Sequence, residues 1–245
     1  MTPPDPSTII ASRTIDPSTH RRAAAFAALG EPARLAIVEH LSLTDRTPSE
    51  LSAALGIGSN LMAHHLDVLA RSGLVARRRS DGDARRRYVT LGPDVPHGVV
   101  VDERIEVARV VFVCRHNAAR SPFAAGLWAA RSDVPATSAG AAPRAAVHPL
   151  AVEAAARFGV DLRHPVPQGY ETATGTVPTL VVSVCDVAWE DDPPLVAARR
   201  LHWSTPDPIA HGGLAAFEAA FAAIEARITR LAAVVALPGA HDAHG

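Results

Sequence analysis

Cys114, Arg120 and Ser121 carry the clearest chemistry in this 245-residue sequence. A cysteine thiolate is a strong nucleophile. A planar guanidinium can bind two oxygens of a tetrahedral oxyanion at once, because its N–H groups form a fork. A serine hydroxyl beside the sulfur could donate a hydrogen bond to the thiolate. This spacing predicts a site in which sulfur attacks a bound oxyanion.

The residues around this trio predict the elements that position it. The apolar run 110–113 is typical of a strand buried on both faces of a parallel sheet, and an Ala-rich helical pattern begins at Ser121. A loop between such a strand and such a helix directs backbone N–H groups and the helix dipole toward one point, where an oxyanion binds and a thiolate is favoured. Asn117 could brace the loop, because Asn tolerates left-handed backbone. The predicted oxyanion-binding residues are Arg115, His116, Asn117, Ala118, Ala119, Arg120 and Ser121.

The segment CRHNAARS, residues 114–121, resembles the loop of the low-molecular-weight protein tyrosine phosphatase superfamily, which includes the thioredoxin- and thiol-coupled arsenate reductases. The run TSAG, 137–140, resembles that family's second strand, and Asp207-Pro208 resembles its general-acid loop. The resemblance covers residues 107–236. It implies that Cys114 is the nucleophile, that Arg120 binds the oxyanion and that Asp207 protonates the leaving group.

The second half of the chain alternates strands with helices, which predicts a small parallel α/β sheet. We expect strands over 108–113, 134–139, 179–184 and about 200–203, and helices over 121–131, 149–158 and 214–236. Tyrosine phosphatases of the family usually carry aromatics after Asp-Pro. Here Ile209-Ala210 follows, which resembles the arsenate reductase branch and favours a small inorganic oxyanion over phosphotyrosine.

Cys185 follows the predicted strand 179–184 and would lie at the same sheet edge as Cys114. In the thioredoxin-coupled arsenate reductases that this region resembles, a Cys here attacks the arsenylated nucleophile and releases arsenite. Those enzymes use one more Cys shortly afterwards, where this sequence has Asp192. Two routes stay open: an external thiol protein reduces a Cys114–Cys185 disulfide, or a small thiol attacks arsenylated Cys114 and a glutaredoxin-like partner completes the reaction. A buried structural cysteine is the alternative interpretation of Cys185.

The first half of the chain predicts a winged helix–turn–helix. Helices are expected from Pro17 to about Leu29, from Pro32 onward, and over the segments SELSAALG and SNLMAHHLDVLARSG. The turn 80–83 then joins two strands in a hairpin. The predicted interior positions are Ala53, Leu55, Leu61, Leu66 and Leu69.

The run AHHLDVLARSGLV, residues 63–75, resembles the ArsR family of bacterial repressors, although Ala63 stands where many members have Ser. The resemblance implies binding of a double-stranded DNA operator as a homodimer, through the first helix. Residues 1–107 contain no Cys, which argues against direct arsenite sensing by this domain. The predicted DNA-facing residues are Ser59, Asn60, Met62 and His64 on the recognition helix and Arg77, Arg78, Arg79, Arg85, Arg86 and Arg87 on the wing.

Charge divides the chain in the same way. Residues 17–91 carry 11 Arg against 7 acidic groups, whereas residues 92–245 carry 12 Arg against 16. We therefore expect two domains, 17–91 and 107–236, with different partners, a linker over 92–106, and disordered tails over 1–16 and 237–245. Two cysteines and no evident signal peptide or membrane span predict a cytoplasmic protein.

Three functions fit these residues. The first is a DNA-binding regulator fused to a thiol-dependent arsenate reductase, with a role in arsenical resistance. It would hold no bound cofactor or metal and would use an external reductant of mycothiol, glutathione or thioredoxin type. The second has the same fusion acting on phosphomonoesters. The third has a non-catalytic oxyanion or redox sensor in place of the enzyme.

Overall fold

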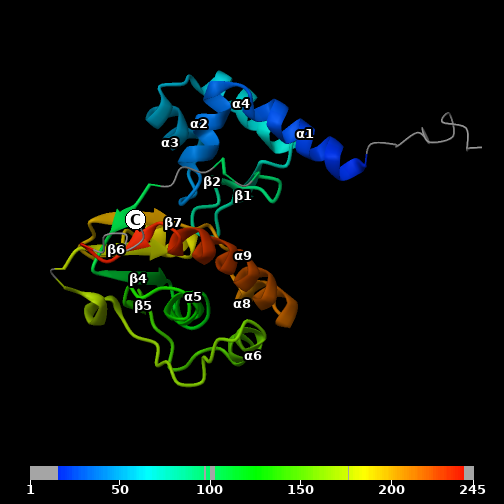
Figure 1. The fold of residues 1–245 in the computed structure, drawn as a ribbon. Helices are drawn as coiled ribbons and strands as arrows, with labels where there is room; N and C mark the ends of the chain where they lie inside the picture. Colours follow the sequence, from blue (N-terminus) through cyan, green and yellow to red (C-terminus); the bar gives the residue numbers. More distant parts are fainter. Residues whose placement is uncertain (1–15, 97, 100–102, 176, 240–245) are drawn as a thin grey trace, which may run out of the picture.

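The computed structural model describes residues 16–96, 98–99, 103–175 and 177–239. An N-terminal helical domain with a β-hairpin lies against a C-terminal domain built on a parallel sheet, as the sequence predicts (Figure 1). The predicted disordered tails, 1–16 and 237–245, lie mostly outside the described residues. Among the described residues, no helix is both long and apolar enough to cross a membrane.

The N-terminal domain begins with helices that start at proline, whose fixed φ suits the first helical position. Thr47 and Glu50 add a capping box in front of the third helix, and Gly56 ends it with φ 65°. The elements are α1 (Pro17–Leu29), α2 (Pro32–His40), α3 (Pro48–Leu55), α4 (Ser59–Arg71), β1 (Val75–Arg79) and β2 (Arg87–Leu91). The antiparallel strands β1 and β2 and their turn are called the wing below, and residues 80–83 the wing tip.

The buried face of α4 differs from the prediction by one position. Leu66 and Leu69 are buried as predicted, but Leu61 is 53% exposed. Ala53, on α3, was also predicted to be interior and is exposed. Met62 is 1% exposed and packs in the domain core, so its predicted contact with DNA is wrong. Positions 62, 66 and 69 share one face of a helix, and the adjacent apolar pair 61–62 leaves the choice of face to tertiary packing.

The C-terminal domain is organised on a parallel sheet with the strand order β5-β4-β6-β7. A separate short pair, β3 and β8, joins the segment before this sheet to the end of the last helix. The elements are β3 (Ile105–Glu106), β4 (Arg109–Cys114), α5 (Arg120–Ala129), β5 (Ala136–Gly140), α6 (Pro149–Arg157), η2 (Tyr170–Ala173), β6 (Thr179–Ser183), α7 (Asp186–Glu190), β7 (Arg199–His202), α8 (Pro208–His211), α9 (Leu214–Ala232) and β8 (Val235–Ala236).

Several short elements escape the sequence pattern. The helices η2, α7 and α8 were not expected, because one or two turns are too short to show a period. Helix α9 ends at Ala232 rather than at residue 236, since Val235–Ala236 form β8. The strand β3, which pairs with β8, lies inside the segment predicted as linker, 92–106. Pairing between residues so far apart in sequence is a tertiary event that local periodicity does not report.

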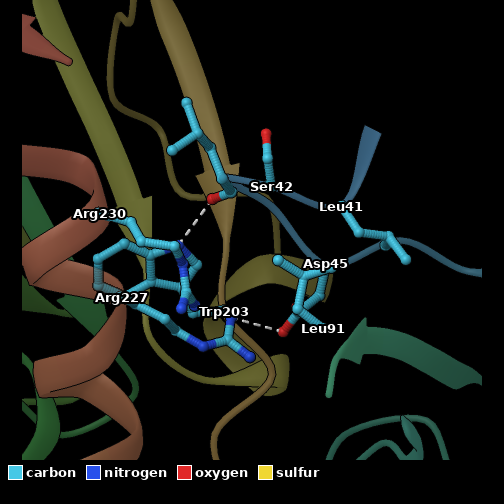
Figure 2. A pocket seen from close by; sticks show the side chains of 8 residues that line it. Leu41, Ser42, Asp45, Leu91, Trp203, Arg227 and Arg230 are labelled. Atoms are coloured by element: carbon cyan, nitrogen blue, oxygen red, sulfur yellow. Dashed lines mark hydrogen bonds and ion pairs between the residues drawn. The ribbon is translucent and has the colours of Figure 1, made fainter. Parts of the chain in front are cut away.

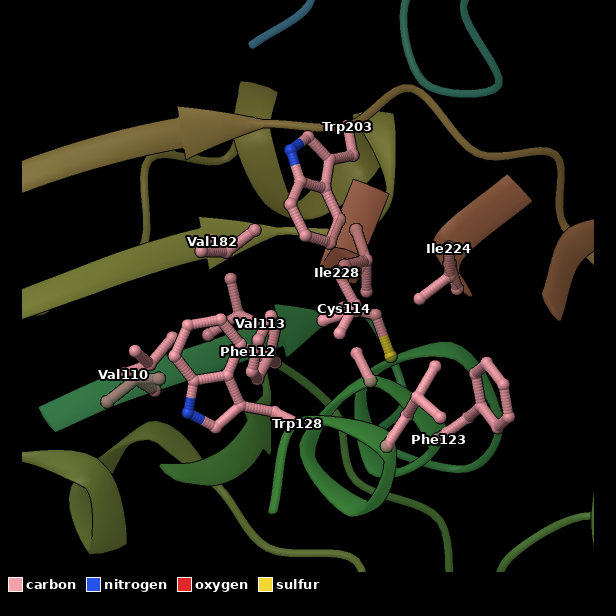
Figure 3. Packing of buried hydrophobic residues seen from close by; sticks show 14 of the residues in the cluster. Val110, Phe112, Val113, Cys114, Phe123, Trp128, Val182, Trp203, Ile224 and Ile228 are labelled. Atoms are coloured by element: carbon pink, nitrogen blue, oxygen red, sulfur yellow. The ribbon is translucent and has the colours of Figure 1, made fainter. Parts of the chain in front are cut away.

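The core packs helices against the sheet with aromatic contacts. Phe112 of β4 lies near Trp128 and Trp203, with ring centroids 6.0 and 6.1 Å away (Figure 3). Phe123 of α5 stacks on Phe221 of α9 at 3.9 Å. The chain leaves β4 for β5 on one side and returns to β6 on the other. Ligands of α/β sheets bind at such a switch point, beside the carboxyl ends of the two central strands, and this region of β4 and β6 is called the crevice below.

Candidate active site

Cys114 ends β4 at this crevice and is 3% exposed (Figure 3). Its Sγ lies 3.0 Å from the Ser121 hydroxyl oxygen. Asn117 donates from Nδ2 to that same oxygen at 2.8 Å. The Ser121 hydroxyl, which also lies 3.5 Å from the Ala139 carbonyl, can donate its proton to the sulfur. Asn117 has φ 46°, the left-handed backbone expected for it.

The backbone of the loop between β4 and α5 is held from outside by the segment 142–148. The carbonyls of Arg115, His116 and Ala118 accept hydrogen bonds from the N–H groups of Ala142, Arg144 and His148, at 2.8, 3.1 and 2.8 Å. Each carbonyl therefore points toward that segment. In a trans peptide the next N–H points the opposite way, so the following amides are turned away from 142–148.

Gly140 at the end of β5 allows this loop to fold closely. A Cβ at position 140 would lie 2.8–2.9 Å from backbone atoms of Asn117, Arg115 and Cys114. Contacts with backbone are not relieved by a side-chain rotation. The glycine of the TSAG run is therefore required by the close approach of β5 to the loop.

Arg120 is the cationic centre of the crevice and is 5% exposed. It donates to the Thr205 carbonyl at 2.8 Å and forms an ion pair with the Asp207 carboxylate at 3.3 Å. Burial disfavours its charge, but the neighbouring Cys185, Cys114 and Asp207 outweigh burial and raise the pKa of Arg120. The structure thus brings the predicted residues Arg120 and Asp207 into contact.

Cys185 lies at the same edge, as the N-cap of α7, and is 1% exposed. Its Sγ accepts the Ala188 N–H at 3.3 Å. Burial raises the pKa of Cys185 to about 12, with the Arg120 charge and the N–H groups of Ala188 and Arg115 acting in the opposite direction and Cys114 adding to the rise. Cys185 is therefore a thiol at neutral pH. Both cysteines are free.

Tyr170 is a site residue that the sequence prediction missed. Burial, followed by the negative charge that Cys185 and Cys114 carry when they are ionised, raises the pKa of its hydroxyl. That buried hydroxyl has no hydrogen-bond partner among the described residues. A lone tyrosine after the QG dipeptide carries no sequence pattern that would have placed it beside two thiols.

On the N-terminal domain, the predicted recognition residues Ser59, Asn60 and His64 are exposed on α4. A hollow of about 430 Å³ lies beside them, lined by residues of α3, α4 and the wing that include Arg77 and Arg87. The wing arginines are exposed at positions 77, 79, 85, 86 and 87. Of these predicted DNA-facing residues, Ser59, Arg77 and Arg87 line the same hollow.

Arg78 is the exception, because it contacts the C-terminal domain. Its side chain, 18% exposed, pairs with the fully buried carboxylate of Asp186 at 3.0 Å and with Asp81 at 2.6 Å. Asp186 also accepts the Asp81 N–H at 2.9 Å and contacts the His202 ring nitrogen at 3.1 Å. The carboxylate next to Cys185 thus holds the wing.

Glu190 at the other end of α7 holds the wing tip as well. It accepts hydrogen bonds from the Ser80 and Tyr88 hydroxyls at 2.7 and 2.9 Å and from the Asp83 N–H. A Cβ on Gly82 would lie 2.2 Å from the Glu190 carboxylate. The absence of a side chain at Gly82 allows the tip to approach α7.

A second set of contacts between the domains lies around the loop after α2 (Figure 2). Asp45 accepts the Ser204 N–H at 2.6 Å and pairs with Arg227 at 2.8 Å. Trp203 donates from its indole to the Leu43 carbonyl at 2.8 Å. These buried contacts and those of α7 fix the wing beside the crevice.

Comparisons with known proteins agree with this architecture. Residues 109–238 match the sequence model of the family described as low molecular weight phosphotyrosine protein phosphatase. The chain belongs to this family. Residues 29–78 match a helix–turn–helix domain, which is ArsR-like. An HTH-type transcriptional regulator of Mycobacterium tuberculosis strain H37Rv is 37% identical over 97 residues, which are 39% of this chain and 82% of that protein. The protein therefore joins an HTH-type regulator domain to a domain of the low molecular weight phosphotyrosine protein phosphatase family.

Solved structures similar to the phosphatase-family domain include proteins of both kinds. An arsenate reductase from Archaeoglobus fulgidus shares 25% identity, over 51% of this chain and 98% of its own, with a TM-score of 0.43. A tyrosine phosphatase from Erwinia amylovora shares 24% identity, over 51% and 90%, with a TM-score of 0.43. A thioredoxin-dependent arsenate reductase from Corynebacterium glutamicum shares 24% identity, over 51% and 60%, with a TM-score of 0.40.

Proposed function

We propose that the C-terminal domain reduces arsenate with thiols and that the N-terminal domain binds operator DNA. The observation that carries the enzymatic part is the pair of buried cysteines beside one guanidinium. Cys114 and Cys185 both interact with the charge of Arg120, which also pairs with Asp207 at 3.3 Å. Hydrolysis of a phosphate ester needs one nucleophilic sulfur, whereas reduction of an oxyanion consumes two thiols.

The first step is attack by the Cys114 thiolate on arsenate bound to Arg120 and the loop amides. A sulfur–arsenic bond forms, and one arsenic–oxygen bond breaks. Asp207 acts as the general acid and gives a proton to the departing oxygen, which leaves as water. The Ser121 hydroxyl, 3.0 Å from Sγ, stabilises the thiolate before attack.

In the second step a thiol attacks Cys114 sulfur. A disulfide forms, the electron pair of the sulfur–arsenic bond stays with arsenic, and As(V) becomes As(III), released as arsenite. In this proposal Cys185 is that thiol, and an external dithiol of thioredoxin type or a monothiol such as mycothiol or glutathione then reduces the disulfide. Because the pKa of Cys185 is raised to about 12, its thiolate fraction grows about tenfold per pH unit through the neutral range.

The test is arsenate-dependent turnover by the purified full chain, with thioredoxin, glutathione and mycothiol systems compared in parallel. Cys114→Ser should abolish arsenite production. Cys185→Ser should abolish turnover with thioredoxin but retain it if a small thiol attacks the adduct directly. Wild-type turnover that survives Cys114→Ser would exclude this mechanism.

Phosphomonoester hydrolysis is the second candidate, and one observation favours it. Cys185 Sγ accepts the Ala188 N–H and caps α7, which gives this sulfur a structural role. In that case para-nitrophenyl phosphate would be hydrolysed with a Cys114-dependent burst, arsenate would not be reduced, and Cys185→Ser would keep full hydrolytic activity.

A further inference from the structure

The wing tip reaches the rim of the candidate active site. The Asp81 carboxylate accepts the backbone N–H of Asp207 at 2.9 Å. Its charge also acts on the buried Arg120, whose guanidinium pairs with Asp207. One turn of the N-terminal domain therefore fixes the backbone of the residue that would protonate the leaving group.

The same hairpin carries the arginines that would meet DNA. Arg78 is the member that pairs with Asp81 and with the buried Asp186, at 2.6 and 3.0 Å. Carboxylates of α7 and the wing tip thus occupy donors that phosphates attract: the Arg78 guanidinium, the N–H groups of Asp81 and Asp83, and the Ser80 hydroxyl. Duplex DNA that draws the wing toward its own phosphates must break these contacts.

We propose that the wing tip is a component of the oxyanion site, with Asp81 as a positioning residue for Asp207, and that duplex DNA and this site compete for the wing. The proposal rests on the proposed function for the place where the oxyanion binds, and does not depend on turnover. An oxyanion bound at Arg120, beside the Asp207 that Asp81 positions, favours the docked wing, whereas DNA favours the released wing. By linkage, each weakens the binding of the other by the same factor.

Two measurements test the competition without catalysis. The first is the affinity for a labelled duplex of arbitrary sequence at low ionic strength, with and without inorganic phosphate, using sodium chloride to match ionic strength. The second is the rate of Cys114 alkylation by iodoacetamide, followed by mass spectrometry, with and without the duplex. We expect phosphate to weaken DNA binding by about 5-fold or more, and DNA to accelerate alkylation.

Three variants separate positioning from a general loss of charge. Asp81→Ala removes the acceptor of the Asp207 N–H and should abolish the effect of phosphate on DNA binding. Asp81→Asn keeps an acceptor oxygen and should restore most of it. Asp83→Ala is the matched control, because it removes the same charge from the same turn, where the carboxylate pairs with Arg85 and Arg86. It should retain the full effect.

The outcomes distinguish this proposal from the proposed function. Phosphate-sensitive DNA binding in a protein that does not reduce arsenate would sustain the competition and exclude the reductase. Arsenate reduction in a protein whose DNA affinity ignores phosphate would sustain the reductase and overturn the competition. An equal phosphate effect in Asp81→Ala and Asp83→Ala would overturn the positioning role of Asp81.

Discussion

Helix α4 and the wing are both predicted to face DNA, but they differ in what they contact. The recognition helix leaves Ser59, Asn60 and His64 exposed to solvent. The wing places Arg78 against a buried carboxylate of the C-terminal domain and its tip against Glu190. An arginine binds whichever anion its fold supplies, so two similar arginines in one hairpin can serve different partners.

Removal of the Asp186 carboxylate should produce the largest difference in stability between changes in the wing contacts and changes on α4. Asp186→Ala leaves Arg78 and His202 without their buried partner, which costs about 3–5 kcal/mol of the free energy of unfolding. Asp67→Ala is the matched control, because Asp67, 52% exposed, pairs with Arg77 on the surface, and its loss should cost at most about 1 kcal/mol. Urea unfolding measures both, and equal losses would contradict a docked wing.

Truncation of Met62 should affect stability, whereas truncation of its neighbour should not. Met62 is 1% exposed and Leu61 is 53% exposed. Met62→Ala should cost about 2–5 kcal/mol through lost burial and a cavity. Leu61→Ala should stay within about 0.5 kcal/mol and change only DNA affinity. If Leu61→Ala lowers the free energy of unfolding by urea more than Met62→Ala does, the recognition helix buries a different face from the one described above.

Acid should weaken the docking of the wing but leave α4 folded. Burial opposes ionisation of Asp186, but hydrogen bonds from His202, Ser204 and the Asp81 N–H, with the Arg78 charge, hold its pKa below 3.8. A pKa lower in the folded than in the unfolded state gives stability that is present above the unfolded pKa and lost as pH falls through the folded one. The measurement is the rate of Cys114 alkylation as the pH falls, which should rise when the wing is released. The double variant Glu190→Gln, Asp186→Asn lacks the docking carboxylates and gives the dependence of alkylation on pH that does not come from docking.

The smallest expected effect distinguishes two arginines of the wing by their influence on DNA binding and on Cys114 alkylation. Arg87→Ala should lower the salt dependence of DNA binding by about one released counterion and leave Cys114 alkylation unchanged. Arg78→Ala should accelerate alkylation without DNA, because it removes the wing's ion pair with Asp186. If both variants alkylate at the wild-type rate, the Arg78 contact does not hold the wing.

The residues of the candidate active site around Cys114 could be predicted because they are contiguous in the sequence. The run 114–121 places a nucleophile, loop amides, a guanidinium and a helix N-terminus within one strand–loop–helix unit. The capping box of Thr47 and Glu50 and the glycine turn after it likewise indicate a helix–turn–helix. Such signals act over a few residues and need no knowledge of the rest of the chain.

Other features depended on which segments meet. Adjacent apolar residues such as Leu61 and Met62 differ only in the side of the helix that packing covers. Tyr170, the first residue of η2, and Thr205, after β7, lie in segments without a motif. The opposite charges of the two halves predicted two domains with different partners, but they did not indicate that Asp186 and Glu190 would bind the wing.

The sequence by itself determined the two domain types and the residues around Cys114, because short-range propensity and backbone geometry are local properties. The tertiary structure alone decided that Arg78, 108 residues from Asp186, would pair with it across the domains. A carboxylate that folding removes from water needs a cation and hydrogen-bond donors beside it. That condition depends on the whole fold and places the wing of the regulator at the mouth of the phosphatase-family site.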